Sequence, residues 1–168
     1  MTSRVQVFAL MGALGMALCS PAAWAQGTFS LKLLTPETAL AAAQAALKRC
    51  RDQGYQVAVA VVDRFGVPQI LLRDRFAGPH TVDAATGKAW TAVSFRTPTV
   101  DLVGQTQPGG TSNGIRNLPR VVILGGGVLL EGGGSILGGI GVSGAPGGEA
   151  DDGCAKAGVA AVRDALEF

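Results

Sequence analysis

Histidine, cysteine, aromatic and charged residues are scarce in this chain, and each shortage argues against a class of protein. One histidine and three cysteines argue against metal clusters rich in these ligands, such as structural zinc sites. Aromatic residues make up only 5% of the chain, too few to suggest a surface that stacks nucleobases. Charged residues make up 15%, and the 14 basic residues are scattered, with a net charge of +2. We therefore expect no nucleic-acid partner and no anionic membrane partner.

Glycine and hydrophobic residues are abundant instead. The chain has 25 glycines among 168 residues, about twice the usual share of roughly 7%. Of these, 17 lie between residues 104 and 153. The hydrophobic fraction is 48%, and part of that excess comes from one N-terminal run. The length itself fits a single domain, since domains typically hold about 100–200 residues.

The N-terminus has the pattern of a secretory signal peptide. Arg4 precedes an apolar stretch from Val5 to Leu18, and Ala23-Trp24-Ala25 forms an A-x-A cleavage site before Gln26. The apolar stretch is shorter than the roughly 20 residues of a membrane-spanning helix. Lipidation at Cys19 is not favoured, because the residue before it is not small. The sequence predicts cleavage between Ala25 and Gln26, and a periplasmic or secreted protein with no membrane association after cleavage.

The predicted mature chain is nearly neutral, with 13 basic and 12 acidic residues, and its periodicity is that of one α/β unit. Residues 26–33 form a short lead, and residues 34–168 form the domain. We expect helices near residues 36–53, 82–95, 98–103 and 149–166. Strands are expected at residues 55–62, 68–73, 121–124, 128–131 and 135–142. Hairpins linked in this order imply an antiparallel sheet with helices packed on it.

Two patterns suggest chemistry but lack the context that this chemistry needs. Residues 139–144 match the dinucleotide pattern G-x-G-x-x-G, yet Pro146 follows where a helix should open. Ser143 could form a nucleophilic triad with His80 and Asp83, but Ala145 stands where the G-x-S-x-G motif has glycine. Neither dinucleotide binding nor hydrolysis is therefore favoured.

His80 is the only imidazole, and two interpretations of it stay open. It lies between Pro79 and Thr81 just before a predicted helix, so it can be a surface residue that caps this helix. It can also be an axial ligand of a haem iron, which one histidine suffices to supply. In that case Phe76 would contact the ring, and Arg73 and Arg75 would pair with the propionates.

Several motifs in order resemble the GlcG/HbpS family of small haem-binding-type domains, found also at the C-terminus of PduO-type proteins. They are the stretches 59–66 (AVVD…G), 88–92 (KAWTA), 125–127 (GGG) and 138–144 (GGIGVSG), together with Arg73. The resemblance covers about residues 34–166. It implies a profilin-like α/β/α sandwich around a five-stranded antiparallel sheet, and homo-oligomers. It also implies haem or tetrapyrrole binding in some members, and haem sensing and degradation in one extracellular branch.

Two functions follow from this resemblance as alternatives. The first is an exported haem- or tetrapyrrole-binding protein, with His80 as the iron ligand. The second is an enzyme, or an accessory subunit of one, that acts on a small polar metabolite in the same cleft.

Export would leave Cys50 and Cys154 as the only cysteines. In the α/β/α arrangement, the first and last helices would carry both residues on inward faces. We therefore expect a disulfide between Cys50 and Cys154, as an oxidising compartment allows. The alternative is two small buried thiols.

Overall fold

The structure is a computed structural model, and it describes residues 27–167. The predicted signal peptide and its cleavage site at Ala25 and Gln26 lie outside these residues. The helices are α1 (Pro36–Asp52), α2 (His80–Phe95), α3 (Thr99–Gln105) and α4 (Gly148–Leu166), with a short 3-10 helix at Asn113–Asn117. The strands are β1 (Ala58–Asp63), β2 (Pro68–Arg73), β3 (Gly127–Gly132) and β4 (Ser135–Ser143).

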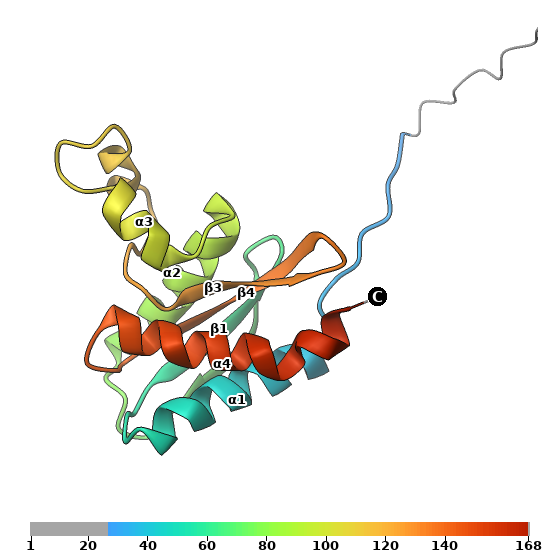
Figure 1. The fold of residues 1–168 in the computed structure, drawn as a ribbon, viewed down its shortest axis with the longest axis horizontal. Helices are drawn as coiled ribbons and strands as arrows, with labels where there is room; N and C mark the ends of the chain where they lie inside the picture. The colour runs from blue at the N-terminus through green and yellow to red at the C-terminus, as the bar shows by residue number, and fades with distance from the viewer. Residues whose placement is uncertain (1–26, 168) are drawn as a thin grey trace, which may run out of the picture. The chain divides into compact units, whose positions relative to one another are not determined.

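The strands form one antiparallel sheet in the order β2-β1-β4-β3. Helices α1 and α4 lie side by side on one face of the sheet, and α2 covers the other (Figure 1). The predicted α/β/α sandwich is therefore confirmed. The sheet has four strands rather than the five that we expected.

The missing strand is the predicted segment 121–124, which runs along α2 instead of joining the sheet. The backbone N–H of Val122 donates to Thr91 Oγ1 on α2 at 2.9 Å. Gly87 lets this segment come close, since a Cβ there would meet a methyl carbon of Val122 at 2.5 Å. Val122 thus packs on the helix and Ile123 is buried, whereas Leu124 stays exposed.

Helix α1 begins as its sequence predicts. Thr35 caps it by accepting a hydrogen bond from the backbone N–H of Thr38 at 3.3 Å, and Pro36 is the first helical residue. The main hydrophobic core lies between the sheet and the α1–α4 layer. It contains Val59 and Val61 of β1 and Ile140 and Val142 of β4.

Helix α2 packs on a strand face that has almost no side chains. A Cβ on Gly141 of β4 would collide with the carbonyl oxygen of Ala85, and one on Gly139 would lie 2.9 Å from that of Ala89. The glycines therefore allow the helix backbone to rest directly on the sheet. This close approach fixes the first turns of α2 against the end of β4.

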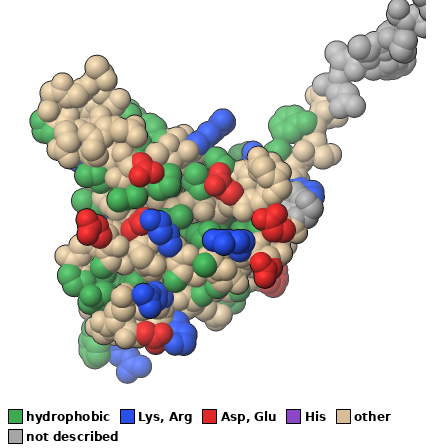
Figure 2. Space-filling model, in the orientation of Figure 1, with side chains coloured by type: hydrophobic (Ala, Val, Ile, Leu, Met, Phe, Trp, Pro, Cys, Tyr) green, Lys and Arg blue, Asp and Glu red, His purple; other side chains and the backbone are tan. Residues whose placement is uncertain are grey.

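The surface carries charges of both signs. Acidic and basic side chains alternate over the face that bears α1 and α4 (Figure 2). Within residues 27–167, no helix is both long and apolar enough to cross a membrane.

Candidate functional site

A cleft of about 640 Å³ opens where the first turns of α2 and α4 meet the end of β4. The segment 54–56 that follows α1 and the loop 143–148 between β4 and α4 complete its walls. This volume lies within the range of about 300–1,000 Å³ that is typical of small-molecule sites. The cleft is the candidate functional site.

The outer part of the cleft carries an exposed imidazole and two exposed apolar side chains. Phe76 is 80% exposed and Leu124 is 56% exposed, and both line the cleft together with His80. His80 is the first residue of α2, so this helix starts two residues earlier than predicted. The side chain of His80 lies against Gly78, where a Cβ would meet the imidazole at 2.7 Å.

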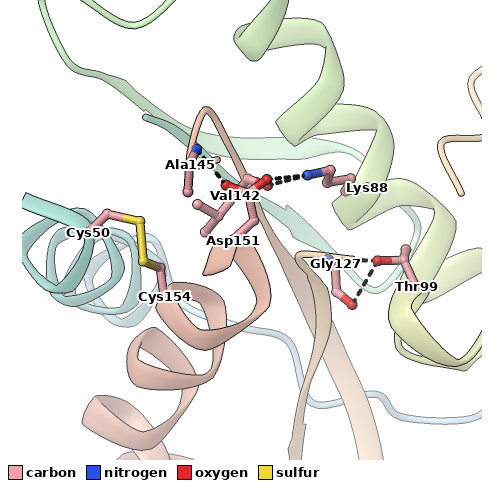
Figure 3. Close-up of polar contacts among 8 residues, drawn as sticks. All are labelled: Cys50, Lys88, Thr99, Gly127, Val142, Ala145, Asp151 and Cys154. Carbon is pink, nitrogen blue, oxygen red and sulfur yellow. Dashed lines mark hydrogen bonds and ion pairs between the residues drawn. A yellow bond between two sulfur atoms is a disulfide. The ribbon is translucent and has the colours of Figure 1, made fainter. Parts of the chain in front are cut away.

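The inner part contains a buried ion pair. Lys88 Nζ donates to Asp151 Oδ2 at 2.7 Å and to the carbonyl oxygen of Val142 at 2.9 Å (Figure 3). The side chains of Lys88 and Asp151 are only 2% and 5% exposed, and both residues line the cleft. The other carboxylate oxygen of Asp151, Oδ1, accepts from the N–H of Ala145 at 3.0 Å. The pair thereby joins α2, β4 and α4 at the floor of the cleft.

Burial dominates the electrostatics of Asp151. It raises the pKa of this carboxyl above its ordinary value, while the hydrogen bond and the positive charge of Lys88 act in the opposite direction. Perturbed ionisable groups in a cleft are typical of functional sites.

The four residues predicted to bind haem separate into two groups. His80 and Phe76 line the cleft, whereas Arg73 and Arg75 do not. Arg73 donates to the carbonyl oxygen of Ala77, with an Nε–O distance of 3.0 Å. Arg75 lines a neighbouring depression that shares Phe76 with the cleft. The side chains of Arg51 and Asp74 form an ion pair there.

The triad that the sequence suggested is not assembled. Ser143 and His80 line the same cleft, but Asp83 lines a different hollow next to Arg120. Among residues 27–167, no three His, Cys, Asp or Glu side chains cluster as a metal site would require.

The disulfide lies beside the cleft. Cys50 on α1 and Cys154 on α4 are bonded, with their Cα atoms 5.6 Å apart (Figure 3). Both are fully buried. The predicted pairing is thus present in the structure, and it attaches the helix that carries Asp151 to α1.

Residues 34–160 match the family described as "Haem degrading protein HbpS-like". The chain belongs to the HbpS-like family. A double mutant of Streptomyces reticuli HbpS is 38% identical, with a TM-score of 0.76 over 86% of this chain and 97% of that one. The structure named "PduOC:Heme Complex" is 31% identical, with a TM-score of 0.72 over 77% of this chain and 95% of that one. The family resemblance drawn from the sequence is confirmed.

One curated relative of this HbpS-like chain is a longer protein, and only a domain-sized part of it matches. The corrinoid adenosyltransferase PduO of Citrobacter freundii is 35% identical over 103 residues, which are 60% of this chain and 31% of PduO. The chain thus matches about a third of the length of that relative.

The sequence did not predict the buried pair at the floor, and it suggested Ser143 only as a member of the triad that is not assembled. Lys88 lies 63 residues from Asp151, and in the sequence it stands out only as part of the KAWTA motif. Asp151 lies at the start of the predicted helix 149–166, where an acidic residue is common without any role in a cleft. One signal was available: Lys88 interrupts the apolar stripe formed by Ala85, Ala89 and Ala92, and a lysine there needs a buried partner.

Proposed function

We propose that this protein binds haem or a related tetrapyrrole in the cleft, with His80 as the axial ligand of the iron. The observation that carries the proposal is that the only imidazole of the chain lines a cleft next to the exposed ring of Phe76. An apolar group exposed beside a metal-ligating side chain suits a flat, largely apolar ligand. The family description and the haem complex of a relative support the same ligand class.

The residues present fit this group. His80 would hold the iron, and Phe76 and Leu124 would contact the macrocycle. Haem bound in this way would supply redox and dioxygen chemistry at its iron. Arg73 and Arg75 lie outside the cleft lining, so they are not part of the proposal.

Haemin titration followed by Soret absorbance tests the proposal. We expect His80→Ala to weaken haemin binding at least about tenfold, or about 1.4 kcal/mol, and added imidazole to restore the Soret spectrum. Phe76→Ala should also weaken binding. Phe65→Ala is the matched control, because Phe65 is 63% exposed but does not line the cleft. Equal haemin affinity of the wild type and His80→Ala would reject the ligand assignment.

That result would favour the second candidate, an enzyme or accessory subunit acting on a small polar metabolite. The buried Lys88–Asp151 pair favours it, because charged groups at a cleft floor suit a polar ligand better than a purely apolar one. Two results together would identify this case: haemin affinity that His80→Ala leaves unchanged, and protection of the folded protein against thermal unfolding by a polar metabolite.

The proposal includes export and self-association. We expect the mature protein in the periplasm or secreted, beginning at Gln26, and forming a homo-oligomer. Mass spectrometry of the exported protein should give this N-terminus, and light scattering should give a multiple of the mature chain mass. A full-length chain retained in the membrane fraction would contradict export, and a monomer at micromolar concentration would contradict self-association.

A further inference from the structure

The floor of the cleft has a serine hydroxyl without a partner among the described residues. Ser143 is the last residue of β4 and is 8% exposed. Its neighbour Val142 points into the α1–α4 core, so Ser143 points to the α2 side, because side chains alternate along a strand. The residue lines the cleft, and its hydroxyl has no hydrogen bond to any described residue. A hydroxyl held at the floor of a cleft without a protein partner is free to bind a ligand.

Lys88 has a donor to spare at the same place. An ammonium group has three N–H donors, and those of Lys88 have two acceptors among residues 27–167, Asp151 Oδ2 and the carbonyl oxygen of Val142. The two oxygens of Asp151 are already engaged by Lys88 and by the N–H of Ala145. Lys88 therefore keeps one N–H donor that no described residue uses.

The backbone around the cleft adds positive potential. Helices α2 and α4 both begin at the cleft, and helix N-termini carry a partial positive charge. In the first turn of α4, the N–H groups of Gly148 and Glu149 have no acceptor in the described part of the chain, whereas those of the next two residues bond to the carbonyl oxygen of Gly147. Of the acidic residues in these first turns, Glu149 and Asp83 do not line the cleft, and Asp151 lines it but is paired with Lys88.

We propose that the floor of the cleft is a subsite for a carboxylate of the ligand, which accepts hydrogen bonds from Ser143 and Lys88. Unused donors and two helix N-termini together favour an anion that accepts several hydrogen bonds. The carboxylate can come from a haem propionate or from a small free carboxylic acid. A subsite for a haem propionate rests on the proposed function, whereas a subsite for a free carboxylic acid does not.

Haemin and haemin dimethyl ester, which differ only at the carboxylates, test the first source. We expect wild type to bind haemin about tenfold more tightly than the ester, since hydrogen bonds to a charged group are the strong ones. Ser143→Ala should reduce this preference to less than about threefold, because one donor is lost. Ser135→Ala is the matched control, since Ser135 is the exposed first residue of the same strand and does not line the cleft. It should keep the full preference.

Succinate tests whether the subsite binds a small free carboxylic acid. The melting temperature is measured with succinate and, as the control, with sodium chloride at equal ionic strength. A ligand that binds only the folded state raises the melting temperature. We expect succinate to stabilise wild type and Ser135→Ala but not Ser143→Ala if the subsite binds free carboxylates. If haemin fails to bind at all, the proposed function is rejected, while succinate still decides the subsite. Equal binding of haemin and its ester without stabilisation by succinate, or effects that Ser143→Ala leaves intact, would overturn the proposal.

Discussion

Lys88 and Asp151 are two charged side chains that fold into the interior only as a pair. Lys88→Met removes one partner and leaves a carboxyl 5% exposed without its cation. Such a change typically destabilises by about 3–5 kcal/mol, whereas replacing both members of a buried pair is often nearly neutral. We expect Lys88→Met to lower the free energy of unfolding by that amount in urea titrations, and Lys88→Met/Asp151→Asn to recover most of it. A double variant as unstable as the single one would show that the pair itself is not the cause.

The same carboxyl makes stability depend on pH. Burial raises the pKa of Asp151 above its ordinary value, despite the opposing effect of Lys88. The folded state then binds the proton more tightly than the unfolded state, so this contribution to stability is complete below the ordinary carboxyl pKa of about 3.9. It is lost as the pH rises through the raised pKa. The free energy of unfolding of wild type should therefore fall relative to that of Asp151→Asn as the pH rises from about 4, in urea titrations at several pH values. A constant difference would contradict the raised pKa.

Ser143, Lys88 and Asp151 also show why the site could be predicted only in part. His80 and Phe76 lie four residues apart, so the sequence alone indicated that they lie close together in the fold. The residues of the floor come from α2, β4 and α4, and only the folded sheet brings them together. Closeness in sequence to His80 suggested a common site for the arginines as well, but the sequence does not show that Arg73 donates to the carbonyl oxygen of Ala77.

At the scale of elements, the contact between α2 and β4 depends on glycine. Gly141→Ala would drive a Cβ into the carbonyl oxygen of Ala85 and to 2.7 Å from the N–H nitrogen of Ala89. Backbone atoms on both sides leave little room to adjust, so we expect a loss of about 3 kcal/mol or more in the free energy of unfolding. The matched control is Gly153→Ala, at an exposed position in α4 with open space around it. This change should stabilise by about 0.5–1 kcal/mol, and both effects can be measured by chemical denaturation.

Element boundaries were predictable where local chemistry decides them. The cap at Thr35 and the turn after β1 are encoded by a few neighbouring residues, and the structure has both. Helix faces were less predictable. The spacing of Leu40 from Ala43 and Leu47 suggests an inward position, yet Leu40 is 37% exposed, because α1 packs on α4 through its alanines. The segment 121–124 has the composition of a strand, yet Thr91 offers its backbone a partner outside the sheet.

At the scale of the whole molecule, the disulfide restrains the unfolded chain. Cys50 and Cys154 are separated by 104 residues, and removing a native disulfide typically costs about 2–5 kcal/mol. We expect Cys50→Ala/Cys154→Ala to lose stability in this range, measured by thermal and chemical unfolding. Thiol titration of the denatured, unreduced wild type should detect no free thiol from this pair. Two reactive thiols there would contradict the bond.

This bond also determines what a single cut in the backbone would do. The loop from Gln107 to Arg120 lies between the two cysteines and contains many exposed residues, among them Arg116 and Arg120. Trypsin that cleaves after Arg120 would leave one cysteine on each fragment. The nicked protein would migrate as one band without reductant and as two bands with it, and the two halves of the cleft would stay tethered. A protease in an oxidising compartment could thus open this loop without releasing either fragment.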